Sequence, residues 1–475
     1  MADRPNILLL LTDEERERIW FPDHVRFPSR ERLAQRGMRF TNHHVHTFPC
    51  TPSRASILTG RHAAGTAMFD NVNFNWQKPL EPTIPTLGHL LSQAGYRCGY
   101  LGKWHLGGES RRHGLTPYGF TDWKAPDAHG TPYLGHFIDG RTAAQAAKWI
   151  TGRTGEDEPW ALVCSFVNPH DIMLYPRFRK PRVRDHGATL PPSFSDDLLT
   201  KPITQRYWRV TCDITGGTIV GEKAWRRLIN AYIDLNLEVD RHIGTVLDAL
   251  AASGAESDTL VLCTSDHGDL AGAHGLRQKG ANLYRENAQV PLTMAWPGVI
   301  PAGGSTQRLS GAIDLLPTVL SVAQAATSVP ALPGRDLSQL WSDADRVVRD
   351  EILITSDAFS SMGPAGPHRG FLRGIVTETH KYGRYFLPGE QRLGRAAADL
   401  ELYDRAADPA ELCNLAHPDV GGPDVASLVV DLDRRLDAVI AAEIGSDDVD
   451  LPLPKSKLAA LGYPWRRRAR AENVV

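Results

Sequence analysis

Residues 50–54 bring a cysteine, a proline, a serine and an arginine together at the spacing C-x-P-S-R, a combination that could do chemistry. The run that follows is typical of a helix; Thr51 suits its cap and Pro52 its first turn. The side chain of Cys50 would then lie at the positive end of the helix dipole, beside free backbone N–H groups. Such a position favours binding of a tetrahedral oxyanion, whereas a buried core cysteine is the alternative interpretation of this segment.

Acidic side chains follow two apolar runs that are typical of buried strands. Asp13 follows the run Ile7–Leu11, and Asp266 and His267 follow the run 259–264. Because parallel strands place their carboxyl ends at one sheet edge, we expect these groups to meet. Carboxylates brought together repel each other unless a cation lies between them, so these residues are candidate ligands of a divalent metal. Taken alone, the second group is equally well read as a polar turn.

The elements that must position these residues alternate between short apolar runs and helical patterns. The runs at 7–11, 160–167 and 259–264 are continuously apolar, which is typical of a parallel sheet covered on both faces. Apolar residues at helical spacing predict a long helix from about 225 to 250 and a second one from Ile84 to Ala94. We therefore predict an α/β fold with a large mixed, mostly parallel sheet flanked by helices.

Near residue 345 the sequence pattern changes from alternating apolar runs and helical patterns to short predicted strands joined by turns. We predict a large domain over 1–345, a smaller C-terminal α+β subdomain over 346–450, and a C-terminal tail over 451–475. The tail carries a basic cluster and is predicted to wrap the body or a neighbouring subunit, which makes it a candidate homo-oligomer contact; a solvated end is the alternative. Within the subdomain, short strands are expected at 351–355, 370–377 and 381–386, and a helix from about Val425 to Ala442.

Composition narrows the class of protein. The chain has 475 residues with a formal net charge of -2, and this balance argues against nucleic acid or an anionic membrane as partner. The start of the chain contains no apolar run long enough for a signal peptide, so we expect a soluble, cytoplasmic protein. The six cysteines show no paired spacing, and Cys98, Cys164 and Cys263 lie in apolar runs typical of buried free thiols.

The motif at 50–60 resembles the signature of the type I sulfatases, a formylglycine-dependent family of the alkaline phosphatase superfamily. The resemblance extends from Pro5-Asn6-Ile7 to residues 401–404, and so covers most of the chain in the expected order. It implies an alkaline-phosphatase-like fold. It also implies that a formylglycine-generating enzyme oxidises Cys50 to formylglycine, and that the oxidised Cys50 joins Asp13, Asp266 and His267 around one divalent metal.

The resemblance extends to a set of basic residues. Lys103 and His105 lie in a G-K-x-H-L-G element, His170 follows the strand at 160–167, and Lys279 matches the second lysine of the family. In this interpretation Arg54, Lys103 and Lys279 stabilise negative oxygens, His105 takes a proton from the nucleophile, and His170 is a candidate proton donor to the leaving oxygen. Any one of these residues alone would be read as an ordinary surface residue; their order along the chain favours a site.

One departure from the usual pattern affects the metal. Many sulfatases carry two aspartates after the first strand and Asp-Asn later, whereas this chain has Asp13-Glu14 and Asp266-His267. The histidine resembles choline-sulfatase-like and phosphonate-monoester-hydrolase-like members. Ca²⁺ is the default expectation and Mn²⁺ the alternative, because a mixed carboxylate and imidazole site suits Mn²⁺ better than an all-oxygen site. Whether Glu14 is a ligand or a turn residue stays open.

The leading functional hypothesis is a sulfuric ester hydrolase of the arylsulfatase type that cleaves small sulfate monoesters through a formylglycine hydrate. The alternative is a phosphonate monoester or phosphodiester hydrolase on the same scaffold, because both anions are tetrahedral. A third hypothesis, a protein that only binds sulfated ligands, is disfavoured because binding alone needs no proton-transfer groups such as His105 and His170. The natural substrate is not identified by the sequence.

Two polar groups near the motif have no assigned role. His43, His44 and His46 precede it at a spacing that fits no established metal site, so loop or helper residues are the preferred interpretation. The segment from Asn71 to Trp76, with further asparagines at 73 and 75, could line a substrate pocket or form a polar surface loop.

Overall fold

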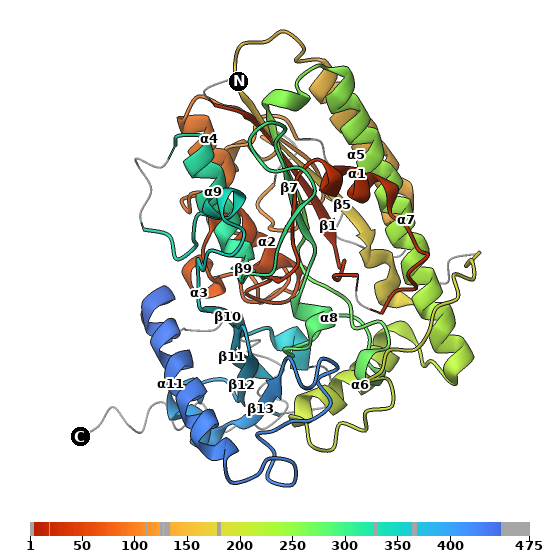
Figure 1. Ribbon diagram of the computed structural model, residues 1–475, viewed down its shortest axis with the longest axis vertical. Coiled ribbons are helices and arrows are strands. Elements are labelled where there is room, and N and C mark those ends of the chain that lie inside the picture. The colour runs from red at the N-terminus through yellow and green to blue at the C-terminus, as the bar shows by residue number, and fades with distance from the viewer. Residues whose placement is uncertain are drawn as a thin grey trace.

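The computed structural model describes residues 4–18, 20–109, 113–123, 127, 134–177, 182–325, 331–362 and 368–447. These residues form a seven-stranded sheet, a four-stranded antiparallel sheet and a small two-stranded pairing. Figure 1 shows the four-stranded sheet below the large one, with the last helix along its outer side. The predicted α/β class, with a mostly parallel sheet and a separate α+β part near the C-terminus, is confirmed.

The large sheet is built around its first strand. Strand β1 (Asn6–Asp13) pairs in parallel with β5 on one side and with β6 on the other. The antiparallel pairings in this sheet are those of β7 with β6 and with β2. In spatial order the strands are β4 (Arg97–Gly102), β5 (Trp160–Pro169), β1, β6 (Thr259–Ser265), β7 (Leu292–Ala295), β2 (Met38–Phe40) and β8 (Gly304–Thr306).

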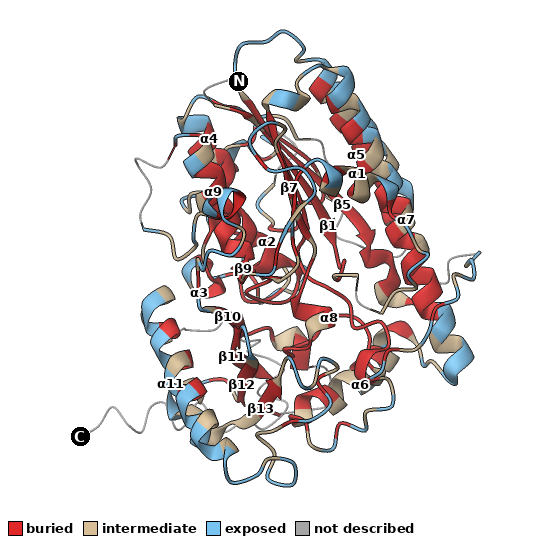
Figure 2. Ribbon diagram, viewed as in Figure 1, coloured by how far each residue is buried: buried red, intermediate tan, exposed pale blue. Residues whose placement is uncertain are grey.

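Helices cover both faces of this sheet, which explains why its strands are continuously apolar (Figure 2). Ile7, Leu9 and Leu11 point to one face and Leu8 and Leu10 to the other. The first face packs against α2 (Cys50–Thr59), α4 (Leu87–Gln93) and α9 (Leu315–Val322), and the second against α1 (Pro28–Gln35), α5 (Leu134–Thr151) and α7 (Glu222–Ala252).

Shorter elements connect these layers. Strand β3 (His43–His44) pairs in parallel with β9 (Ser310–Gly311), just before the segment that leads into α2. Further α-helices in the described part of the chain are α3 (Ala63–Thr66), α6 (Ile203–Gly216), α8 (Arg285–Ala288) and α10 (Gln339–Ser342).

The small sheet is packed between the last helix and the large part of the molecule. Leu353 and Ile375 face α11, where Leu436 is buried, whereas Ile352 and Ile354 face the core of the large part. The alternation along β10 follows the two-residue period of a strand. The elements are β10 (Glu351–Ser356), β11 (Phe371–Thr377), β12 (His380–Phe386), β13 (Asp399–Asp404) and α11 (Val425–Glu443).

Local details correct one predicted boundary. The helix expected from Ile84 begins only at Leu87, because Pro85 disfavours a helical residue before it and Thr86 caps the helix by accepting from the backbone N–H of His89. The C-terminal helix agrees with its prediction within one residue. The domain boundary at 345 stays a prediction, and the tail at 451–475, with its proposed oligomer contact, lies outside the described residues.

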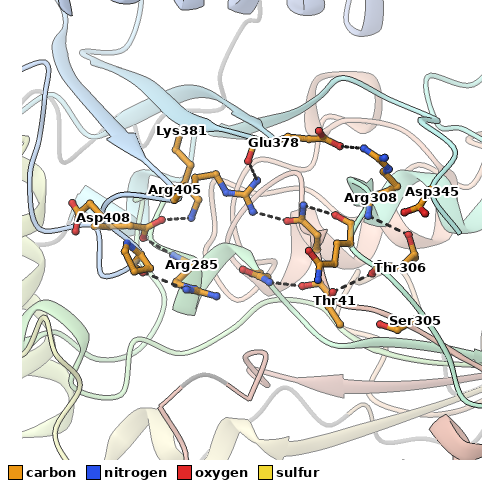
Figure 3. Close-up of a pocket in the computed structure, with 16 residues that line it drawn as sticks. Thr41, Arg285, Ser305, Thr306, Arg308, Asp345, Glu378, Lys381, Arg405 and Asp408 are labelled. Atoms are coloured by element: carbon orange, nitrogen blue, oxygen red, sulfur yellow. Dashed lines mark hydrogen bonds and ion pairs between the residues drawn. The ribbon is translucent and has the colours of Figure 1, made fainter.

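A polar cavity of about 890 Å³ lies where residues of the large part meet the small sheet (Figure 3). Its charged lining is largely self-paired: Arg308 contacts Glu378 at 2.7 Å, and Lys381 contacts Glu411 at 2.5 Å. None of the predicted site residues lines it. None of the described helices combines the length and apolar character that crossing a membrane requires.

Candidate active site

The predicted groups meet at the carboxyl ends of three adjacent parallel strands. Asp13 is the last residue of β1, His170 follows β5, and Asp266 and His267 follow β6. The register pairs Asp13 with Pro169, which precedes His170, and Thr12 with Ser265, which precedes Asp266. Parallel pairing therefore brings residues more than 150 positions apart to one edge of the sheet.

Helix α2 delivers Cys50 to the same edge. The helix begins at Cys50, which is fully buried, and its cap position is occupied by Pro49. The predicted capping role of Thr51 is wrong, because its hydroxyl instead donates to the backbone carbonyl of His105 at 2.7 Å. This bond joins the start of the helix to the segment that carries Lys103 and His105.

Arg54 connects the two carboxylates. It lies four residues after Cys50, and hence on the same side of the helix. Its Nη2 donates to Oδ2 of Asp13 and its Nε to Oδ2 of Asp266, both at 2.8 Å. Its remaining donor, Nη1, is used by the carbonyl of Lys103 and the hydroxyl of Ser165, each at 2.9 Å. Arg54 therefore fixes one oxygen of each carboxylate and leaves each Oδ1 facing the other side.

Four ligand atoms converge on that other side. Nε2 of His267 lies 3.1 Å from Sγ of Cys50, and Oδ1 of Asp13 lies 3.8 Å from the same sulfur. Oδ1 of Asp266 lies 3.7 Å from Nε2 of His267, and the four ligand atoms all lie within 4.8 Å of one another. The Nδ1 of His267 donates to the carbonyl of Gly268 at 3.0 Å, which leaves its Nε2 lone pair for a ligand. These residues fit one divalent cation.

The pKa values of the two carboxyl groups shift in opposite directions. Burial alone would raise the pKa of Asp13, but the charges of Lys103 and Arg54 outweigh it and hold that pKa well below its usual range. Burial and the negative charge of Asp13 raise the pKa of Asp266. The negative charge of Asp13 thus disfavours ionisation of Asp266, and a divalent ion between the two carboxylates would relieve that repulsion.

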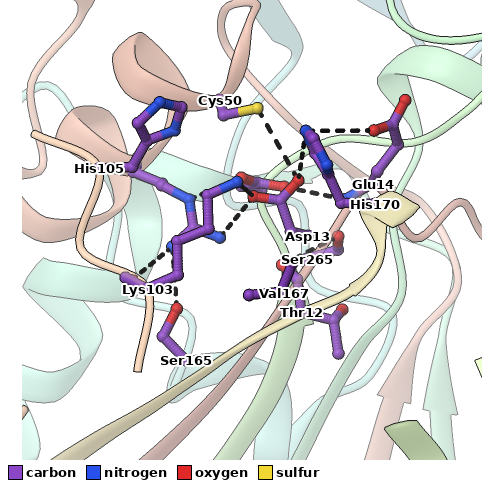
Figure 4. A network of polar contacts seen from close by, with 12 residues as sticks. Thr12, Asp13, Glu14, Cys50, Lys103, His105, Ser165, Val167, His170 and Ser265 are labelled. Atoms are coloured by element: carbon purple, nitrogen blue, oxygen red, sulfur yellow. Dashed lines mark hydrogen bonds and ion pairs between the residues drawn. The ribbon is translucent and has the colours of Figure 1, made fainter. Parts of the chain in front are cut away.

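Further charged groups surround these carboxylates (Figure 4). Nζ of Lys103 lies 2.6 Å from Oδ2 of Asp13, and Nζ of Lys279 lies 2.8 Å from Oε2 of Glu14. Nε2 of His170 lies 3.8 Å from Oδ1 of Asp13 and 3.6 Å from Oε2 of Glu14. Glu14, which the sequence left undecided, is thus buried inside the cluster and leaves its Oε1 without a hydrogen-bond partner among the described residues.

Burial favours the neutral form of His170, Cys50 and Glu14. Burial, and then the positive charges of Lys279 and Lys103, lower the pKa of His170 well below its usual range. Burial and Asp13 raise the pKa of the Cys50 thiol to about 11, and burial raises the pKa of Glu14 well above its usual range. Without further ligands, His170 is neutral and Cys50 a thiol at neutral pH.

His105 is held by residues that its motif does not include. Its Nε2 lies 2.5 Å from Oδ1 of Asn73, and its backbone N–H donates to the carboxylate of Asp127 at 2.7 Å. Its φ of 58° is in the left-handed region, as is the φ of 67° at Glu14. Non-glycine residues adopt this region at an energetic cost, and such strain concentrates at functional sites.

The segment after α2 therefore belongs to the site. Besides the contact of Asn73 with His105, Oδ1 of Asn71 accepts the backbone N–H of Thr51 at 3.1 Å. In the sequence, these asparagines lie between the motif at 50–54 and the element that carries Lys103 and His105, and this position was the feature that could indicate their role in the site. No sequence signal distinguished Asp127 from other acidic residues.

Comparison with known proteins identifies the family to which this fold belongs. The sequence model of the sulfatase family matches residues 5–325, and a model described as N-sulphoglucosamine sulphohydrolase, C-terminal, matches residues 272–442. The chain is 28% identical to the choline-sulfatase of Rhizobium meliloti (strain 1021), covering 91% of this chain and 86% of the relative. It is 27% identical to arylsulfatase A of Homo sapiens, covering 87% and 84%.

Solved structures share the fold. A 2-O GAG sulfatase superposes with a TM-score of 0.75 at 24% identity, covering 94% of this chain and 93% of that one. The phosphonate monoester hydrolase of Agrobacterium radiobacter gives a TM-score of 0.72 at 23% identity, covering 93% and 96%. The chain belongs to the sulfatase family. It is a sulfatase, and its reaction class is the hydrolysis of sulfate esters.

Proposed function

We propose that this sulfatase is a formylglycine enzyme of the arylsulfatase type that hydrolyses small sulfate monoesters. The observation that supports the proposal is the position of Cys50: fully buried, at the N-terminus of α2, and 3.1 Å from a histidine at the strand edge. Oxidised by a formylglycine-generating enzyme, Cys50 would supply a hydrated aldehyde, with one hydroxyl as nucleophile and the other for sulfate release.

One divalent ion would be held by Oδ1 of Asp13, Oδ1 of Asp266, Nε2 of His267 and the oxidised Cys50. Carboxylate oxygens favour Ca²⁺, and the single imidazole keeps Mn²⁺ as the alternative. When bound, the ion supplies positive charge beside the nucleophile and the sulfate oxygens. Glu14, which lies with Asp13 and His170 in a neighbouring group of ligand atoms, is a candidate for a further oxygen ligand.

The basic residues of the site would have different roles in the reaction. Lys103 and Lys279 place positive charge at the cluster, whereas Arg54 acts as a positioning residue because four of its five N–H donors already bond to protein acceptors. His105, held by Asn73, would take the proton of the second hydroxyl.

His170 would donate a proton to the leaving oxygen. Burial lowers the pKa of His170 most, and the charges of Lys279 and Lys103 lower it further; a bound sulfate would offset the lysine contribution and so shift the pKa upward. The proton would therefore be taken up with the substrate and transferred as the S–O bond breaks.

The alternative activity, hydrolysis of phosphonate monoesters or phosphodiesters, keeps support from the phosphonate monoester hydrolases that share the fold. A tetrahedral phosphorus centre would use the same metal and the same lysines. The charge of the substrate and the group beyond the leaving oxygen would then decide the preference.

Two measurements test the proposal. Peptide mass spectrometry of enzyme co-produced with a formylglycine-generating enzyme should show an aldehyde at Cys50, and activity should scale with that fraction. Full activity with every Cys50 as thiol would overturn it. A panel of aryl sulfates, choline sulfate and aryl phosphonate monoesters then separates the activities, and the highest kcat/KM for phosphonates would favour the alternative.

A further inference from the structure

Two aromatic side chains lie in the segment that borders the active site, and the reaction proposed above does not use them. They are Phe74 and Trp76 of residues 71–77, the segment whose Asn73 contacts His105 at 2.5 Å. We propose that Phe74, supported by Trp76, is a specificity-determining residue that binds the planar, apolar leaving group of an aryl sulfate. The inference rests on the proposed function, because it assigns these rings to the leaving group of that reaction.

The segment lies between the buried site and the solvent. His105 is 2% exposed, whereas Asn73, which contacts its ring, is exposed. A sulfate group held by Lys103 and Lys279 would lie within the buried cluster, so the leaving group has to extend outward from it. The residue after Asn73 is Phe74, whose side chain is half-buried and therefore keeps exposed ring surface where the leaving group would emerge.

The two rings form one flat platform. The ring centroids of Phe74 and Trp76 are 4.5 Å apart, and the ring planes differ by 11°. Phe359, in the segment Phe359–Met362 after β10, packs its ring against Trp76 at 5.8 Å and 79°. Trp76 is thus supported on the side of the small sheet and itself supports Phe74. A planar ring of a ligand can continue this stack on the exposed surface of Phe74.

A buried carboxylate fixes the platform in place. Asp70 is 1% exposed and accepts the indole N–H of Trp76 at 3.0 Å and the backbone N–H of Ser360 at 2.8 Å. It also accepts the hydroxyl of Ser360 and the backbone N–H of Asn71. These bonds order the segment before a ligand arrives, and such preorganisation lowers the entropic cost of binding.

The composition of the segment favours a neutral aromatic group. Residues 71–77 read Asn-Val-Asn-Phe-Asn-Trp-Gln and include no charged side chain. An acidic sugar as leaving group would gain no ion pair from them. A quaternary ammonium is attracted to aromatic faces, but the neighbouring Asp70 is buried and engaged by four donors, so it offers no accessible counter-charge. Stacking of a neutral ring is the interaction that remains.

A binding measurement tests the proposal without turnover. In Cys50→Ala enzyme with Ca²⁺, isothermal titration calorimetry gives Kd for 4-nitrophenyl sulfate and for inorganic sulfate. Adding Phe74→Ala should weaken binding of the aryl ester at least about tenfold and change Kd for inorganic sulfate less than about twofold, because sulfate alone does not reach the ring. Phe74→Leu keeps an apolar side chain without a ring, and its loss should be intermediate.

Kinetics of the formylglycine enzyme provide the second readout. Phe74→Ala should raise KM for 4-nitrophenyl sulfate about tenfold and keep kcat within about threefold. It should leave kcat/KM for choline sulfate, whose leaving group has no ring, within about threefold. The matched control is Trp296→Ala: Trp296 is a half-buried ring packed on Trp341, and it follows β7 at the opposite edge of the sheet. This variant should change neither KM.

The proposal is overturned if Phe74→Ala leaves Kd for 4-nitrophenyl sulfate unchanged. It is equally overturned if inorganic sulfate or choline sulfate loses as much as the aryl ester, because Phe74 would then have only a structural role. Failure of the proposed function gives a different result: Phe74→Ala would still weaken binding of the aryl ester, but enzyme with formylglycine at position 50 would hydrolyse no sulfate ester.

Discussion

The cluster around Cys50 and the cluster of His46, His62 and Glu443 both bury polar groups beside helix α2, but by different means. Around Cys50, Asp13 and Asp266 are fully buried and ionic contacts with Arg54 and Lys103 hold them. At the junction of α11 with the large part, where the second cluster lies, burial lowers the pKa of His46 well below its usual range and so favours its neutral form.

The directions of the pKa shifts show this difference between charged and neutral buried groups. Cations lower the pKa of Asp13, whereas burial lowers the pKa of His43 to about 3 and the pKa values of His44 and His46 well below their usual range. A buried group keeps its charge where opposite charges compensate the lost hydration, and loses it where they do not. The charged cluster is therefore suited to stabilise a reacting anion, and the less charged one to hold the interface between α11 and the large part.

The largest effect is expected at the nucleophile. Cys50→Ala should lower kcat/KM for an aryl sulfate by roughly 10⁵-fold, because it removes the group on which the covalent chemistry depends. The matched control is Cys98→Ala, another buried thiol, which should keep activity. Circular dichroism should show both variants folded. A Cys50→Ala variant with more than about 1% of wild-type activity would contradict the assignment.

The second-largest effect is expected from replacing Asp13 in the charged cluster. Asp13→Asn should abolish binding of the catalytic ion and lower kcat/KM by at least about 10³-fold, because it removes a charged ligand and takes away the carboxylate that pairs with Lys103 and Arg54, leaving Arg54 with Asp266 alone. For the same reason the free energy of unfolding should fall by about 3–5 kcal/mol in urea titrations.

Asp240→Asn provides a comparison for stability alone. Asp240 is 3.0 Å from Arg30 in another buried ion pair, so its loss should also destabilise the fold while activity per folded molecule stays near wild type. Equal loss of specific activity in both variants would mean that Asp13 has only a structural role.

The two active-site histidines should fail in different steps. If His170 protonates the leaving oxygen, His170→Ala should cost about 10²–10³-fold with poor leaving groups and far less with activated aryl esters. His105→Ala should instead let sulfated enzyme accumulate, detectable by mass spectrometry of a quenched reaction. A uniform loss across the leaving-group series would make His170 a binding residue.

The smallest effect concerns the neutral histidines and pH. The pKa of His43 falls from 6.5 to about 3 on folding, so below pH 6.5 the unfolded state binds a proton that the folded state does not. This group therefore lowers stability as pH falls, by about 2 kcal/mol between pH 7 and pH 5. Urea unfolding of His43→Gln should show a pH dependence weaker by that amount; an unchanged dependence would contradict the burial of a neutral imidazole.

Much of the architecture could be read from local pattern. The apolar runs at the positions of β1, β5 and β6 predict strands covered on both faces, and helix α11 was expected within one residue of its observed end. Such patterns are readable because burial imposes a period on nearby residues. The cap of α2 was not readable, because Thr51 donates its hydroxyl to His105, 54 residues away, instead of to its own helix.

The sequence by itself determined which chemical groups the site contains, because these depend on residue type and short spacing. They are the cysteine in C-x-P-S-R, the acidic residues after two strands, and the lysines and histidines in their order along the chain. Only the tertiary structure decided what each does. It made Arg54 a link between two carboxylates, placed Glu14 in the cluster, and joined His62 to Glu443 across 381 residues. These contacts arise where separate elements pack, and no local pattern records which partner a buried polar group will meet.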